Sequence, residues 1–205
     1  MKKFTKITSL LLIAVMIVMS FAACGAKDEI KEVILTYQNA GVELDLEKAQ
    51  TCLDPKCEQY AALAEGIQSG SLTESLTQMG LDEAELKKLL KEYGKLIETD
   101  IKDIKVGRKA GTATALLTTK TPDMESMDEN VMEEFMTAKK ITQEDLIKKA
   151  SSPEEINKLM IEMVEWMIKD KAPTLKKVDE NKKISLKKID GKWLISDIAD
   201  AEIKE

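Results

Sequence analysis

The pair Asp190-Gly191 lies between two runs in which apolar and polar residues alternate. Asp-Gly is a preferred pair for a two-residue β-hairpin turn, because both central residues take positive φ angles there. Such a turn sets Ile189 opposite Lys192 and thereby fixes the later pairs of the two strands. One face of the predicted hairpin then carries four large apolar side chains: Ile184, Leu186, Trp193 and Ile195. We expect this face to belong to the core and the chain from Asp197 onward to fray.

A second hairpin is predicted in the middle of the chain. Residues 112–119 are rich in threonine, alanine and leucine, a composition that indicates a strand in this context. In residues 97–106 the apolar positions change from odd to even between Ile101 and Ile104, which predicts a β-bulge or a change of face. A turn at residues 108–111 joins the two runs as antiparallel strands.

The other stretches predict helices from their apolar periodicity and their capping residues. Asp45 and Asp123 are candidate N-caps, and Ser152 precedes Pro153 at the start of the longest predicted helix. We expect helices to begin near residues 27, 45, 57, 71, 82, 123, 142 and 153. Helices interrupted by two hairpins predict an α+β fold with one antiparallel sheet of about four strands.

The first 24 residues have the plan of a secretory signal peptide. Three lysines precede an apolar run from Ile7 to Met19, and small residues lead to Cys24. Phe21-Ala22-Ala23-Cys24 resembles a bacterial lipobox, with phenylalanine where an aliphatic residue is usual. The resemblance implies cleavage before Cys24 and lipidation of its sulfur. An uncleaved membrane anchor is the alternative, since the apolar run approaches the roughly 18 residues of a membrane span.

Lipidation would hold the chain on the outer face of the cell membrane, outside the cytoplasm. We therefore expect residues 1–23 to be the signal and residues 24–28 the lipidated cysteine with a short tether. Residues 29–198 should form one α+β domain, because a chain of this length supports a single core. Residues 199–205 are expected to be a frayed tail.

The charged residues and the missing histidine exclude several classes of function. Loss of three signal lysines leaves 28 basic against 37 acidic residues, so the net charge falls from −6 to about −9. A negative surface disfavours nucleic acid. The chain has no histidine, which excludes Ser/His and Cys/His catalysis and any zinc site that contains histidine.

Cys52 and Cys57 remain as a pair in an oxidising compartment if Cys24 carries lipid. Pro55 disfavours the helical region for the residue before it, so the chain between the two cysteines can fold back as a turn. A disulfide there would close a very short loop and contribute roughly 2 kcal/mol. Two partly buried free thiols are the alternative.

Three segments carry a resemblance to a family: residues 44–55, residues 112–122 and the closing run 190–195. They look like small lipoproteins of Gram-positive bacteria with a cystatin-like domain, also described as nuclear-transport-factor-two-like. The resemblance implies a curved four-stranded sheet wrapped round helices, a cone that can hold an apolar pocket. It implies no particular activity, because similar folds include enzymes, binding modules and assembly domains.

Two functions follow from this fold. The first is a membrane-anchored binding or interaction module for an unknown small apolar ligand or an envelope protein. Its candidate pocket residues are Tyr93, Met160, Met163, Met167 and Trp193. The second is an enzyme of the cone-fold dehydratase or isomerase type. The ionisable groups nearest the predicted sheet are Tyr93, Asp100, Asp103 and Lys188, and without histidine a carboxylate with a strongly raised pKa would have to act as the base.

A third function is copper(I) capture by thioethers, since soft sulfur ligands select this ion. Seven methionines stand at helical spacing: Met124, Met127, Met132, Met136, Met160, Met163 and Met167. Core packing explains the same spacing, because methionine often fills gaps in cores. The sequence therefore favours the binding module, without a catalytic residue, metal, cofactor or nucleic acid.

Overall fold

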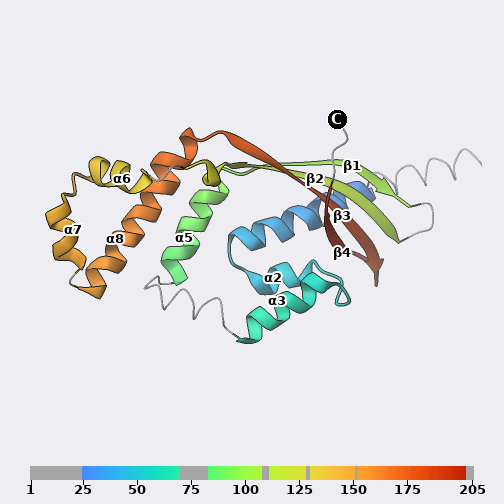
Figure 1. The fold of residues 1–205 in the computed structure, drawn as a ribbon. Helices are drawn as coiled ribbons and strands as arrows, with labels where there is room; N and C mark the ends of the chain where they lie inside the picture. Colours follow the sequence, from blue (N-terminus) through green and yellow to red (C-terminus); the bar gives the residue numbers. More distant parts are fainter. Residues whose placement is uncertain (1–24, 70–82, 108–110, 128–129, 151, 202–205) are drawn as a thin grey trace, which may run out of the picture.

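A four-stranded antiparallel sheet in the order β1-β2-β3-β4 organises the protein (Figure 1). The computed structural model describes residues 25–69, 83–107, 111–127, 130–150 and 152–201. The strands are β1 (Glu98–Val106), β2 (Thr112–Pro122), β3 (Lys177–Ile189) and β4 (Lys192–Asp200). The predicted α+β class is confirmed, and the curved, open sheet is consistent with a cystatin-like cone.

The helices form two groups along the sheet (Figure 1). A first helix covers residues 25–42 and lies near the β3–β4 turn with α2 (Leu46–Thr51) and α3 (Glu58–Ser69). The second group gathers toward the other end of the sheet. It contains α5 (Glu83–Gly94), α6 (Val131–Lys139), α7 (Gln143–Ala150) and α8 (Pro153–Trp166).

The β3–β4 hairpin has the predicted register. Ile189 pairs with Lys192, and Leu186 pairs with Ile195. The two turn residues have positive φ angles, 49° at Asp190 and 82° at Gly191, as the predicted turn requires. The four apolar residues expected on one face are all at most 4% exposed. This face is therefore confirmed as part of the core.

The predicted fraying from Asp197 is wrong, because β4 continues to Asp200. A bulge shifts the register, so that Ile184 faces Ile198 and the apolar side chain of Ile198 packs against the core. The N–H of Ala201 also donates to the carbonyl of Asn181, at 2.9 Å. Long-range pairing thus orders this end of the chain.

The β1–β2 hairpin contains the predicted bulge. The register shifts between Lys102 and Lys105, and Asp103 takes a φ of 51°. This shift lets both Ile101 and Val106 pack against the core. The expected turn at residues 108–110 and the expected helix at residues 71–76 lie outside the described residues.

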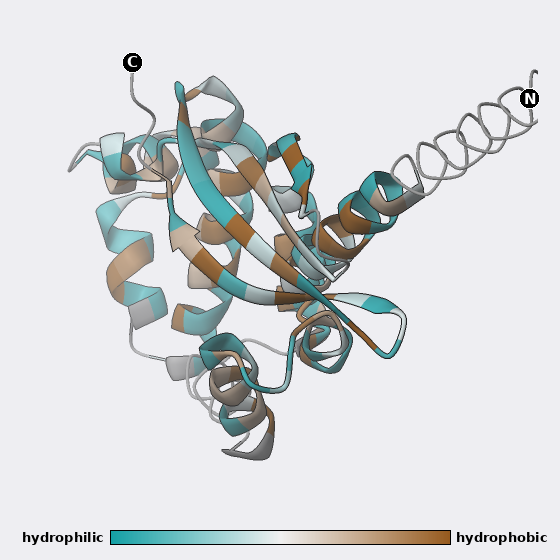
Figure 2. Ribbon diagram, turned by 90° about the vertical axis from the view of Figure 1, so that its right-hand side faces the viewer, coloured by the Kyte–Doolittle hydropathy of each residue, from teal (hydrophilic) through white to brown (hydrophobic). Residues whose placement is uncertain are grey.

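The main core lies between the sheet and helix 25–42. Ile30 and Ile34 of this helix are fully buried against inward residues of β2 and β3, such as Ala115 and Ile184. Figure 2 shows hydrophobic and hydrophilic positions alternating along the strands, as expected when only one face of a sheet is covered. Residues 25–28 were expected to be a tether, but they are helical, because Ala26 packs against this core.

The second group of helices has its own buried residues. Phe135 of α6 and Trp166 of α8 are buried, and their rings lie 5.7 Å apart at 56°. The continuous helix expected from residue 123 is wrong: Asp123 caps a short 3₁₀ turn, Met124–Ser126, and Met127 is extended. Ser152 precedes α8 as predicted but makes no capping hydrogen bond. None of the helices formed by the described residues is long and apolar enough to cross a membrane.

Replacing Ile195 by alanine should destabilise the protein by about 2 to 5 kcal/mol, because its fully buried side chain would leave a cavity. Urea unfolding followed by circular dichroism measures this change. Ile147→Ala is the matched control: Ile147 is 71% exposed on α7, so the free energy of unfolding should change by less than about 0.5 kcal/mol. Equal losses in the two variants would contradict the core described above.

Candidate functional site

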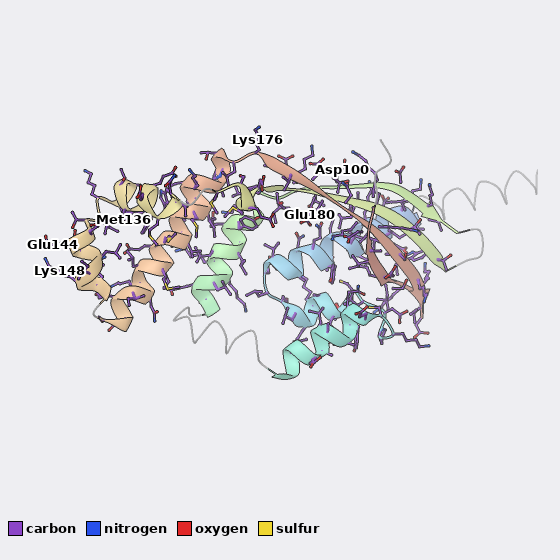
Figure 3. The ribbon with its side chains drawn as sticks, viewed as in Figure 1. Asp100, Met136, Glu144, Lys148, Lys176 and Glu180 are labelled. Carbon is purple, nitrogen blue, oxygen red and sulfur yellow. The ribbon has the colours of Figure 1, made fainter. Side chains whose placement is uncertain are left out.

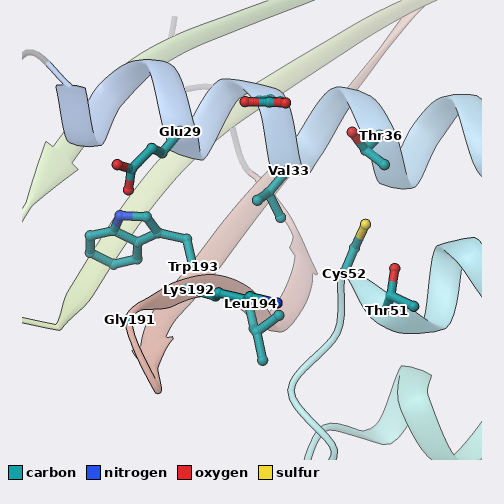
Figure 4. Close-up of a pocket in the computed structure, with 10 residues that line it drawn as sticks. Glu29, Val33, Thr36, Thr51, Cys52, Gly191, Lys192, Trp193 and Leu194 are labelled. Atoms are coloured by element: carbon teal, nitrogen blue, oxygen red, sulfur yellow. The ribbon is translucent and has the colours of Figure 1, made fainter.

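A pocket of about 320 Å³ lies at the free edge of β4 (Figure 4). Its walls come from three parts of the chain: the first half of helix 25–42, the end of α2, and residues 191–194 after the β3–β4 turn. This volume is near the lower limit of the roughly 300 to 1,000 Å³ that ligand pockets occupy. The pocket is large enough for a small ligand.

The segment Cys52-Leu53-Asp54 closes one side of the pocket. Leu53 forms a parallel bridge with Ile195: the N–H of Asp54 donates to the carbonyl of Ile195 at 2.7 Å, and the N–H of Ile195 donates to the carbonyl of Cys52 at 2.8 Å. The residues directly before Cys52 belong to α2, which ends at Thr51. This segment therefore covers the edge of β4 at Ile195, and no other backbone segment among the described residues bonds to the edge nearer the turn.

Asp54 holds this segment in place. Its side chain is buried, its Oδ1 accepts a hydrogen bond from the N–H of Lys56 at 2.9 Å, and its Oδ2 lies 3.8 Å from the Nζ of Lys187. Pro55 keeps Asp54 out of the helical region, which is the turn that the sequence predicts. Because Lys187 is more than half exposed, the ion pair contributes little. Asp54 is thus a structural residue of the turn.

The indole N–H of Trp193 is unusual among the polar groups of this pocket. Its side chain is 4% exposed, and its Nε1 is buried without a hydrogen-bond partner among the described residues. A buried donor without a partner costs about 1 to 3 kcal/mol. Figure 4 shows the indole nitrogen on the edge of the ring that faces Glu29. The wall of the pocket therefore contains a buried donor that has no partner among the described residues.

Charged groups surround this indole. The Nζ of Lys188 lies 5.7 Å from the centre of the Trp193 ring and 3.5 Å from the Oε2 of Glu29. Glu32 follows Glu29 by one helical turn and also lines the pocket. Glu32 has no ion pair with any residue that the structure describes. Lys192 also lines the pocket, so this end carries charges of both signs, and Glu32 is the carboxylate that can accept a cationic group.

The opposite end of the pocket carries Thr36, Thr51 and the thiol of Cys52 (Figure 4). The Oγ1 of Thr51 donates to the carbonyl of Lys48 at 2.7 Å, and the Sγ of Cys52 lies 3.6 Å from the same oxygen. Burial raises the pKa of the Cys52 thiol, although the Thr51 hydroxyl and the Lys48 charge oppose this effect. A thiol with a raised pKa is a poor nucleophile near neutral pH.

Cys52 and Cys57 are two buried free thiols in this structure. Burial raises the pKa of Tyr37, and negative charge on Cys57 or Cys52 would raise it further. The disulfide between the two cysteines stays a prediction. Cys24, the predicted lipidation site, lies outside the described residues.

Of the expected pocket residues, only Trp193 lines this pocket. Met160 and Met163 lie on α8, Met167 follows α8, and Tyr93 lies on α5. These four do not line it, because helix 25–42, rather than α8, covers the sheet beside Trp193. Met160 is instead 46% exposed.

The ionisable groups expected for an enzyme are spread over the molecule. Asp100 pairs with Lys102 at 2.6 Å, Asp103 is exposed at the β1 bulge, and Lys188 faces Glu29. Tyr93 is half-buried on α5, where burial, and then the charge of Glu180, raise its pKa. Only Lys188 lies beside the pocket. The structure does not bring this set together.

Sequence reasoning missed Glu29, Glu32, Thr36 and Thr51 as pocket residues. The three on helix 25–42 flank its apolar stripe, so the helix period places them beside the buried face rather than opposite to it. Their position at the border of the apolar stripe was the signal in the sequence that could have identified them. Nothing in the sequence shows which strand edge they face.

The methionines of the copper(I) hypothesis lie mainly in the second group of helices. Figure 3 shows Met136 and Glu144 at the end of the molecule far from Asp100. Met132 and Met160 are exposed, and the other five are half-buried. The described residues contain no group of three or more Cys, Asp or Glu side chains that could hold a metal ion. Copper(I) capture stays a prediction.

No protein-family model, curated protein or solved structure matches the chain. The geometry of the pocket and the sequence motifs must therefore carry the assignment of function.

Alkylation of the reduced protein should show the raised pKa of Cys52. Because only the thiolate reacts with iodoacetamide, the midpoint of the pH–rate profile should lie higher in the folded protein than in the protein unfolded by guanidinium. Mass spectrometry of the Cys52 peptide gives the rate at each pH. Reduced access would lower the plateau of the profile without moving its midpoint, so equal midpoints would contradict the prediction.

Proposed function

We propose that this chain is a membrane-anchored, extracytoplasmic binding module whose ligand occupies the pocket at the β4 edge. The buried, unpartnered Nε1 of Trp193 is the observation that carries the proposal. Buried polar groups in folded proteins nearly always have a partner, so an exception needs an explanation. Ligand pockets place a few polar groups to orient their ligand, and a ligand is the explanation proposed for this one. Val33 and Leu194 add apolar surface beside it, so the pocket combines shape with a few oriented polar groups.

The lipobox-like motif supports the proposed location. The described part of helix 25–42 follows Cys24 in the sequence, and Glu29 of the pocket lies on its first described turns. At 1.5 Å per residue, Glu29 lies only about 6 Å along the helix from residue 25. A lipid on Cys24 would thus hold the pocket close to the membrane. The resemblance to small lipoproteins of Gram-positive bacteria points to the same location.

The proposed activity is binding rather than chemical conversion. Among the described residues Asp54 is the only buried carboxylate, and it is already satisfied by the N–H of Lys56 and by Lys187. The Cys52 thiol has a raised pKa, which disfavours a nucleophilic role. The polar groups of the pocket are therefore better suited to hydrogen bonding with a ligand than to catalysis.

Replacing Cys24 by alanine should abolish incorporation of labelled palmitate and release the chain from the membrane fraction. The thioether lipid can form only on the cysteine of the lipobox. Cys52→Ala is the matched control and should retain both the label and the location. An unacylated Cys24, or wild-type chain in the cytosol, would refute the proposed anchor.

A tryptophan at Thr36 should block ligand binding, because Thr36 lines the pocket. In a small-molecule screen by thermal unfolding, a compound at 100 times its Kd should raise the Tm of the wild-type protein by roughly 5 to 10 °C. The Thr36→Trp variant should not respond.

The matched control is Leu35→Trp, at the neighbouring position of the same helix. Leu35 is 40% exposed and does not line the pocket, so this variant should respond as the wild type does. A screen without stabilising compounds, or equal responses of both variants, would overturn the pocket as the binding site.

A further inference from the structure

The edge of β4 beside the turn presents backbone groups as well as side chains. β4 is the last strand of the sheet, and the segment around Leu53 covers it only at Ile195. The pocket occupies the next part of this edge, toward Gly191. An uncovered strand edge carries N–H and C=O groups that can pair with another chain.

The hydrogen-bond pattern shows which groups face the pocket. In an antiparallel pair, both backbone groups of a residue point either toward the partner strand or away from it, and residues two apart point the same way. Ile195 points outward, since both of its groups bond to the segment around Leu53. Trp193 lies two residues earlier in the same register. Its N–H and C=O therefore point outward too, toward the pocket.

The cross-strand partner of Trp193 agrees with this assignment. Lys188 pairs with Trp193, yet its N–H donates to the carbonyl of Gly111 at 2.9 Å, away from β4. The two residues thus form a pair without hydrogen bonds between them. No backbone group within the described ranges reaches the outward N–H and C=O of Trp193.

Trp193 consequently offers one backbone donor and one backbone acceptor at this edge, and its buried indole donor lies on the side of the ring that faces Glu29. A donor and an acceptor on one extended residue match the backbone of another extended peptide, which is how a peptide adds to a sheet edge. Glu29 and Glu32 stand beside this edge, and Glu32 has no ion pair within the described residues. Their charge matches a peptide's amino group.

We propose that this pocket binds the amino-terminal end of an extended peptide, which pairs with the outward backbone groups of Trp193 and places its ammonium group beside Glu29 and Glu32. A carbonyl of the same peptide accepts the hydrogen bond of the Trp193 Nε1. Gly191, without a side chain, leaves room where the peptide leaves the pocket. The inference rests on the proposed function of the pocket and adds the class of its ligand.

The direct test is a ¹⁵N NMR titration of the full-length chain in detergent micelles. The probes are tetrapeptide amides of Lys, Val and Thr in every order, each with a free amino end. The Trp166→Phe variant identifies the indole signal of Trp193. A binding peptide should move both the backbone N–H and the indole N–H of Trp193 downfield, saturably, and slow their exchange with solvent. Binding that leaves both signals unmoved would overturn the proposal.

Chemical changes in the best tetrapeptide test each contact. Acetylation of its amino group should weaken binding about tenfold, because a charge-assisted hydrogen bond is lost. Methylation of the amide nitrogen that pairs with the carbonyl of Trp193 should abolish binding. Equal affinity of the free and acetylated peptides would overturn the amino-terminal assignment.

Matched protein variants provide the complementary test. Glu32→Gln should weaken binding of the free tetrapeptide about tenfold. The difference in affinity between the free and the acetylated tetrapeptide should become smaller. Glu43→Gln is the control, because Glu43 is an exposed glutamate outside the pocket, and it should leave both affinities unchanged. Equal effects of the two variants would contradict the role of Glu32.

The two proposals can fail separately. If no tetrapeptide binds, but small molecules stabilise the wild-type protein and not Thr36→Trp, the peptide inference is overturned and the binding function stands. If neither peptides nor small molecules bind, both are overturned.

Discussion

Two backbone hydrogen bonds between Ile195 and the segment Cys52-Leu53-Asp54 determine the shape of the candidate site. They add a one-residue parallel strand to the edge of β4, and they direct the side chain of Leu53 into the core. Because the chain before Cys52 is already helical, this added strand cannot extend along β4 as far as Trp193. The pocket is the part of the edge that remains.

The same contacts link the pocket to the stability of the domain. Trp193 lines the pocket and is also buried in the main core beside Ile195, so a residue of the pocket wall helps to hold the sheet against helix 25–42. Buried apolar neighbours fix the ring of Trp193, and with it the direction of its Nε1. A donor held in this way loses little further conformational freedom when it binds.

Local signals in the sequence were sufficient for the β3–β4 turn and for the β1 bulge. Asp190-Gly191 fixes the turn geometry and thus the register of β3 and β4, and the shift between Ile101 and Ile104 marks the bulge in β1. Fraying after Asp197 was wrongly predicted, because the order of this segment comes from pairing with β3, a contact that a local pattern does not reveal.

The site was only partly predictable for the same reason. Trp193 was expected in a pocket from its place on the inward face of the hairpin, but its partners Glu29 and Thr36 lie more than 150 residues away in the sequence. The sequence does not state which helix covers which part of the sheet. Helix 25–42 and α8 both have broad apolar faces, and tertiary packing places only the first beside Trp193.

The central claim is that the Nε1 of Trp193 is reserved for a ligand. A crystal structure of the protein purified from its native host tests this most directly. The account predicts electron density for a bound molecule in the pocket, with an acceptor atom about 2.9 Å from the Nε1 of Trp193. A pocket filled by the protein's own side chains, with Glu29 accepting the indole hydrogen bond, would contradict it.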